Sequence, residues 1–142
     1  MKRQDIREHL FRLLFRKEFY EDPEMTEQTE RYFENQDTLS DEDSLHQVES
    51  DEDRDYIIKK YDNISRLLPQ IDALIEKSSK GWTIQRISKT DLTILRLAVY
   101  EAVYDDDIPV GVAIDQAVEL AKKYGQDESS SFINGILSGV VK

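Results

Sequence analysis

The sequence predicts an all-α fold made of two small helical bundles that pack together. Apolar side chains recur every three to four residues along most of the chain, which is the period of an α-helix. No stretch shows the sustained alternation of apolar and polar residues that indicates a half-buried strand. We therefore expect one domain over residues 1–142, with an N-terminal bundle at 1–80 and a C-terminal bundle at 81–142.

The first predicted helix covers residues 2–20. Its buried side carries an apolar stripe of Ile6, Leu10, Phe11, Leu13, Leu14 and Phe15. Arg3 and Arg7 lie one turn apart and flank this stripe, so both can reach one phosphate backbone. Arg12 and Arg16 form a second one-turn pair, expected on the opposite, solvated face. Ordinary solvated helix charges are the alternative interpretation of all four arginines.

The middle of the chain is acidic and less regular. A short helix is expected at 26–34, whereas Asn35–Ser50 has too few apolar residues to order itself and is expected to be a mobile loop. A longer helix follows at 55–77, with a stripe that starts at Tyr56. Pro69 either kinks this helix or starts a second one, and residues 78–81 end it.

Three helices are expected between residues 82 and 141. Ser88 and Asp91 have the spacing of a capping box at the start of the first helix. Pro109 separates the first helix from the second, whose stripe starts at Val110, and Gly125 marks the end of the second. Ser129 or Ser130 is expected to cap the third, which should bury Phe132, Ile133, Ile136, Leu137, Val140 and Val141.

The net charge of −11 appears at first to exclude a nucleic-acid ligand. The charge is unevenly distributed, however. Residues 1–20 carry six basic and three acidic side chains, residues 21–55 carry two and fifteen, and residues 56–142 carry eleven and twelve. The acidic excess therefore belongs to one segment, and the first helix is basic.

Composition and motifs give little support to catalysis. His9 and His46 lie in different predicted elements, there is no glycine-rich phosphate loop, and no pair of carboxylates stands out. The absence of cysteine excludes thiolate metal sites and is compatible with a reducing compartment. No apolar run approaches membrane-spanning length, and the polar N-terminus is not a signal peptide. We expect a cytoplasmic protein that is no enzyme, holds no cofactor or metal, and has no membrane contact.

Several motifs, in this order, resemble the NusB family of transcription antitermination factors. The C-terminal motifs are Trp82–Ile87 (WTIQRI), Asp91–Glu101 (DLTILRLAVYE), Ile108–Val110 (IPV), Ala113–Lys122 (AIDQAVELAK) and Phe132–Leu137 (FINGIL). At the N-terminus, Lys2-Arg3, Arg7-Glu8 and Leu14-Phe15 fit the family's arginine-rich first helix. The segment at about 21–55 shares only a helical or variable character.

The resemblance implies an RNA-binding adaptor that acts with NusE, a small-subunit ribosomal protein. Such a pair binds the single-stranded boxA segment of ribosomal RNA leaders and holds it to the elongating RNA polymerase, which suppresses termination. The implied RNA contacts are Lys2, Arg3, Arg7, Arg12, Ser131 and Phe132, and the implied partner contact is Asp91. Two features differ from the family pattern: Gln4 and Ser131 stand where basic residues are common, so RNA affinity should be modest.

Two alternatives remain open at this point. Phe132 is four residues from Ile136, so it either stacks on an unpaired base or belongs to the core. The chain as a whole could also be a protein-binding helical scaffold with little RNA affinity, with a homodimer as one possible form.

Overall fold

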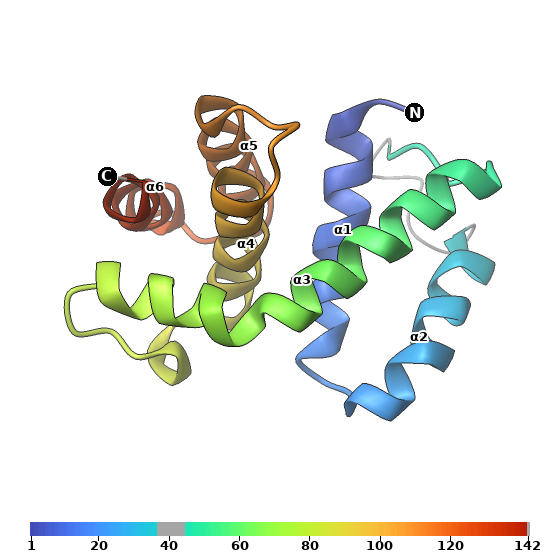
Figure 1. The fold of residues 1–142 in the computed structure, drawn as a ribbon, viewed down its shortest axis with the longest axis horizontal. Helices are drawn as coiled ribbons and strands as arrows, with labels where there is room; N and C mark the ends of the chain where they lie inside the picture. Colours follow the sequence, from blue (N-terminus) through green and yellow to red (C-terminus); the bar gives the residue numbers. More distant parts are fainter. Residues whose placement is uncertain (37–44, 142) are drawn as a thin grey trace. The chain divides into compact units, whose positions relative to one another are not determined.

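The computed structural model describes residues 1–36 and 45–141, and within these ranges every regular element is helical (Figure 1). The predicted all-α fold is confirmed. The chain divides into two compact units, Met1–Asp62 and Asn63–Lys142, so the boundary lies inside a helix and well before residue 80. None of the described helices is both long enough and apolar enough to cross a membrane.

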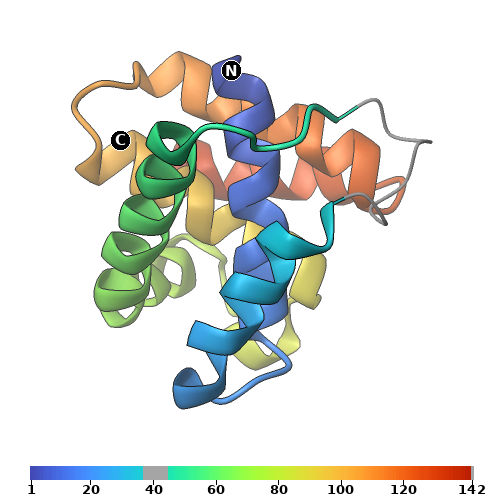
Figure 2. The same cartoon turned by 90° about the vertical axis from the view of Figure 1, so that its right-hand side faces the viewer.

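The N-terminal unit begins with two helices, α1 (Arg3–Lys17) and α2 (Asp22–Glu34), which pack against each other (Figure 2). Helix α2 begins four residues earlier than expected. Pro23 stands in its first turn, where a missing N–H costs nothing, and Asp22 and Glu24 favour the positive end of the helix. The core of this unit contains Leu10, Leu13, Met25, Tyr32, Phe33, Val48 and Ile57.

The connection after α2 is better anchored than the sequence suggested. The Gln36 side-chain amide donates to the backbone oxygens of Phe33 (3.0 Å) and Val48 (2.9 Å), and its own oxygen accepts from the Val48 N–H. Both Gln36 and Val48 are buried. The expectation of a mobile loop over Asn35–Ser50 is therefore wrong for its two ends, and its remainder, 37–44, lies outside the described residues.

Helix α3 (Asp51–Ser78) runs without interruption through Pro69 and contributes to both units. A second helix starting at Pro69 is thus excluded. Pro69 is exposed, and it has no N–H to donate to the carbonyl of Ser65, one turn earlier. Tyr56 is also exposed, which corrects its place in the predicted buried stripe.

The C-terminal unit is built from the second half of α3 and three helices. Helix α4 (Lys89–Val99) passes into a π-helical turn, η3 (Tyr100–Tyr104), and is followed by α5 (Val110–Tyr124) and α6 (Ser129–Val140). Figure 1 shows α4 and α5 side by side, with α6 seen end-on next to them. Arg96 on α4 makes two 2.9 Å hydrogen bonds to the Asp72 carboxylate on α3.

Gly125 ends α5 as predicted, but close packing rather than a left-handed conformation requires it there. A Cβ at this position would lie 2.6 Å from the Ser129 Cβ and 2.7 Å from the Ala121 carbonyl oxygen. The absence of a side chain thus lets the chain turn tightly from α5 into α6. Val110, at the start of α5, is exposed, and Val140 and Val141, at the end of α6, are only half-buried. The predicted buried stripes therefore extended too far along these two helices.

Candidate nucleic-acid interface

The start of α1 exposes two of the basic side chains that the resemblance implicates. Lys2 is the residue before the helix, Arg3 is its first residue, and both are exposed. Arg7, one turn later, is only 5% exposed and interacts with other groups of the chain. The Arg3–Arg7 pair is therefore unequal: Arg3 faces water, whereas Arg7 lies in the packed part of the structure.

The second arginine pair is not on a solvated face, so that expectation is wrong. The Arg16 guanidinium lies 5.2 Å from the centre of the Tyr32 ring and donates to the backbone and side-chain oxygens of Gln28, each at 3.3 Å. Arg12 is half-buried. Because α2 packs against α1, it supplies an aromatic face and a polar edge to the Arg16 side chain. Arg16 thus holds α1 and α2 together.

His9 is the buried polar centre of the N-terminal unit. Its Nε2 lies 2.7 Å from the backbone oxygen of His46 and its Nδ1 lies 2.6 Å from the Tyr32 hydroxyl. A carbonyl can only accept, so Nε2 carries the proton and Nδ1 accepts from Tyr32. Burial lowers the pKa of His9 below its ordinary 6.5, opposed by the hydrogen bond to His46. Both ring nitrogens are thereby occupied, which leaves neither for a metal ion.

Different residues than expected define the start of α6. Glu128 precedes the helix and makes no side-chain cap, whereas Ser129 lies in the first turn, is buried, and accepts from the Gln126 N–H at 2.9 Å. The predicted capping by Ser129 or Ser130 is therefore wrong. Ser129 instead closes the tight turn that Gly125 permits. Ser131 is exposed, at the edge of a shallow depression between α5 and α6.

Phe132 belongs only partly to the core. It is half-buried, and its ring meets that of Trp82 at 5.9 Å and an interplanar angle of 71°, an edge-to-face contact. Trp82 itself is 45% exposed, and the Arg86 guanidinium lies 5.3 Å from its ring centre. The implied RNA contacts include Phe132 but not Trp82 or Arg86, although a tryptophan among basic residues is a visible signal in the sequence.

Asp91 stands in the first turn of α4, but the structure shows only half of the predicted capping box. The Ser88 hydroxyl accepts from the Asp91 N–H at 3.2 Å. Within the described residues, the Asp91 carboxylate returns no bond to Ser88, and its Oδ1 is buried without a hydrogen-bond donor. The backbone of Asp91, rather than its carboxylate, therefore takes part in the cap.

The described side chains contain no cluster of three or more His, Asp or Glu residues that could hold a metal ion. The arrangement is suited to binding: exposed cations at the start of α1, and an exposed aromatic–cation group beside the start of α6.

The chain resembles transcription antitermination proteins over nearly its whole length. The model described as NusB family matches residues 4–142. The Transcription antitermination protein NusB of Lachnoclostridium phytofermentans is 48% identical over 141 residues, which cover 99% of both proteins. The solved structure of T. maritima NusB has a TM-score of 0.78 at 31% identity, and the match covers 99% of this chain and 91% of that one. A chain from the crystal structure of NusB and NusE in complex with dsRNA shares the fold, with a TM-score of 0.77 at 24% identity over 98% of this chain and 95% of that one.

Proposed function

We propose, because this chain belongs to the NusB family, that it is a transcription antitermination factor that binds single-stranded boxA-type RNA together with NusE. In this role it would hold the leader of a ribosomal RNA transcript to the elongating RNA polymerase and suppress premature termination. The observation that carries the proposal is the 48% identity to an antitermination protein over 99% of both chains.

The exposed cations of α1 fit the RNA part of this role. Lys2 and Arg3 are exposed at the start of α1, where they can meet phosphates without first losing an internal partner described above. Arg7 and Arg12 are more buried, so we assign them a weaker, supporting part in phosphate binding. Phe132 and Ser131 supply an aromatic ring and a hydroxyl at the start of α6, where helix N–H groups also favour phosphate.

Asp91 fits the partner part of the role. Its carboxylate is not used by the helix cap, and Oδ1 is buried without a donor among the described residues. Asp91 as a whole is half-buried in the first turn of α4, where a donor supplied by a partner would stabilise its carboxylate. We therefore propose Asp91 as a NusE contact.

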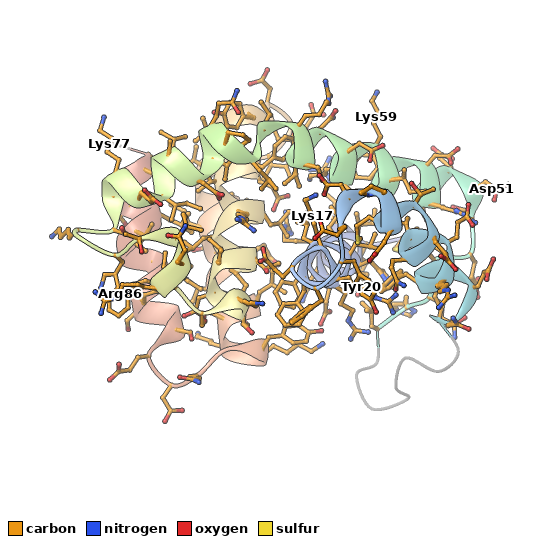
Figure 3. All side chains as sticks on the ribbon, turned by 90° about the horizontal axis from the view of Figure 1, so that it is seen from below. Lys17, Tyr20, Asp51, Lys59, Lys77 and Arg86 are labelled. Atoms are coloured by element: carbon orange, nitrogen blue, oxygen red, sulfur yellow. The ribbon has the colours of Figure 1, made fainter. Side chains whose placement is uncertain are left out.

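The RNA proposal is tested by measuring affinity for boxA RNA over a salt series, in the presence of NusE. Removing one phosphate contact from a single-stranded complex should lower the salt slope by about 0.7, so we expect this change for Arg3→Ala. Lys59→Ala is the matched control, because it removes an exposed cation from α3 that we assign no contact (Figure 3). Arg3 is preferable to Arg7 for this test, since truncating the buried Arg7 would also disturb packing.

Equal affinity and slope in wild type and Arg3→Ala would contradict the assigned contact. A wild-type chain that binds NusE but no RNA would favour the protein-binding scaffold, and its mass in solution would show whether that scaffold is a homodimer.

The partner proposal is tested with Asp91→Asn, which keeps the shape and the backbone cap. We expect weaker NusE binding with an unchanged melting temperature. Asp106→Asn is the control, since it removes the same charge from an exposed turn in the C-terminal unit. Unaltered NusE binding in Asp91→Asn would remove Asp91 from the interface.

A further inference from the structure

The segment Lys77–Thr90 is a second basic region, distinct from the start of α1. It contains four basic residues and no acidic one, in a chain whose net charge is −11. All four basic side chains are exposed: Lys77, Lys80, Arg86 and Lys89. Figure 3 shows Lys77 and Arg86 around the C-terminal end of α3. The segment also contains the chain's single tryptophan, Trp82.

The structure arranges part of this segment into what we call the Trp82 platform, made of Trp82, Arg86 and Phe132. Arg86, at the end of the short 3-10 helix η2 (Ile84–Arg86), holds its guanidinium 5.3 Å from the centre of the indole ring. Phe132 from α6 contacts the indole edge-to-face at 5.9 Å. Trp82 nevertheless stays 45% exposed. Phe132 thus supports Trp82, and the indole is the more accessible of the two rings.

The backbone that carries Trp82 is held on both sides. Lys80 and Gly81 adopt left-handed conformations, with φ of 51° and 100°, which turn the chain sharply at the end of α3. The Ser79 hydroxyl donates to the Trp82 carbonyl, and the Glu76 carboxylate accepts from the Ile84 N–H at 3.1 Å. A non-glycine residue with positive φ persists only where its surroundings fix it. The platform is therefore presented in a defined orientation before any ligand arrives.

We infer that the Trp82 platform is a base-stacking site for single-stranded RNA, with Arg86 and the neighbouring lysines meeting the flanking phosphates. An exposed indole stacks on any unpaired base, and a guanidinium beside it adds cation–π and phosphate contacts. Between Lys77 and Thr90 the sequence has four basic residues and no acidic one, which favours an anionic ligand, and the adjacent Glu76 carboxylate accepts from the Ile84 N–H. The inference rests on the proposed function, because that function supplies RNA as the ligand, and it extends the contact at Phe132 onto the 79–86 segment.

The single tryptophan provides a direct readout. Unlabelled boxA RNA is titrated into the full chain while tryptophan emission is followed, and binding is measured in parallel by the anisotropy of labelled RNA. Stacking on Trp82 should quench its emission with the same midpoint as the anisotropy change. The Trp82→Phe chain supplies the background, including any emission from NusE when the partner is present.

Affinity measurements then separate stacking from charge. Trp82→Ala should weaken RNA binding roughly tenfold or more with little change in salt slope, and Trp82→Phe should weaken it less because a smaller ring remains. Arg86→Ala should lower the salt slope by about 0.7. Tyr20→Ala removes an exposed aromatic ring from the N-terminal unit and should leave RNA affinity unchanged. Melting curves for each variant identify any loss of fold.

The outcomes are distinguishable from those of the Arg3 test. RNA binding that is sensitive to Arg3→Ala but neither quenches Trp82 nor responds to Trp82→Ala would overturn the platform and leave the proposed function standing. A wild-type chain with no RNA affinity in the presence of NusE would overturn both. A Trp82→Ala chain that loses NusE and keeps RNA would make the platform a protein contact and overturn the inference.

Discussion

The two units of this molecule are both helical, but they bury different kinds of side chain. In the N-terminal unit, long polar and charged residues lie among the apolar ones: Arg7, Glu8, His9, Gln36 and Lys60. In the C-terminal unit the buried residues are mainly Ile, Leu, Val and Ala, and Glu101 is the only charged residue among the buried polar groups described there. The structure of the N-terminal unit depends on hydrogen bonds between buried polar groups, whereas that of the C-terminal unit depends on close packing of apolar side chains.

The difference shows how each unit fixes its structure. His9 joins three segments of the N-terminal unit, because it lies on α1 and bonds to Tyr32 of α2 and to the His46 backbone. Such bonds contribute little net free energy when made but cost about 1–3 kcal/mol when one partner is left buried and unmatched. Apolar contacts in the C-terminal unit have no such directionality. They tolerate small shifts but respond strongly to lost volume.

The largest effect is expected from removing volume in the C-terminal unit. Leu95 on α4 is fully buried, so Leu95→Ala should lower the free energy of unfolding by about 2–5 kcal/mol. Chemical denaturation of the purified chain measures this. Val103→Ala removes apolar atoms from an exposed position and should have little effect. Similar losses in the two variants would contradict the view that filled volume stabilises this unit.

A smaller loss is expected from the half-buried ion pair of the same unit. Arg96 and Asp72 are joined by two hydrogen bonds with both partners ionised, and bonds to charged groups contribute about 1.5–3 kcal/mol. Asp72→Asn should therefore lower the free energy of unfolding within that range, with Asp106→Asn as the exposed control. A negligible loss would mean that α3 and α4 are joined by apolar contacts alone.

Periodicity predicted the helices of both units because buried apolar residues must share one helix face. It therefore placed Leu10, Leu13 and Ile133 in the core, and all three are fully buried. It could not show that Arg16 packs on Tyr32, because that contact joins residues sixteen positions apart on two helices. The hydrogen bonds between Gln36 and Val48 could not be predicted for the same reason, since the two residues are distant in the sequence.

Local chemistry at helix ends was predictable only in part. The spacing of Ser88 and Asp91 correctly located the start of α4, and Gly125 located the end of α5. Ser129 was misassigned because a serine at the start of a helix suits a cap and a turn equally, and only the close approach of Gly125 distinguishes them. The assignment of binding residues came from a family resemblance, and periodicity could not have supplied it.

In the N-terminal unit, Tyr32→Phe should cost about 1–2 kcal/mol, because it removes the hydroxyl that bonds His9 and leaves Nδ1 buried without its donor. The ring contacts with Arg16 and Phe33 persist in this variant. Tyr20→Phe, at an exposed position, is the control. Equal stability of Tyr32→Phe and wild type would show that this unit does not depend on the His9 bonds.

The smallest effect is expected from protonating His9, because an imidazolium can still donate from Nε2 to the His46 carbonyl and from Nδ1 to the Tyr32 oxygen. Burial lowers the pKa of His9 in the folded chain, so between that pKa and 6.5 the unfolded chain binds more protons. The free energy of unfolding should therefore rise with pH through this interval. The contribution is fully present above pH 6.5 and is lost as the pH falls towards the folded pKa.

Denaturation at a series of pH values from about 7.5 to about 5.5, in wild type and His9→Gln, isolates this contribution from that of the carboxylates. Glutamine can donate to the His46 carbonyl and accept from Tyr32 but does not titrate, so the stability difference between the two chains should change as the pH falls. Asp5, Glu8 and Arg12 are the charged groups that act on His9, and all three remain in both chains. A stability difference that is constant with pH would mean that His9 titrates alike in the folded and unfolded chain. Burial of His9 in the N-terminal unit would then leave its pKa unchanged, and its buried polar centre would not make the stability of this unit depend on pH.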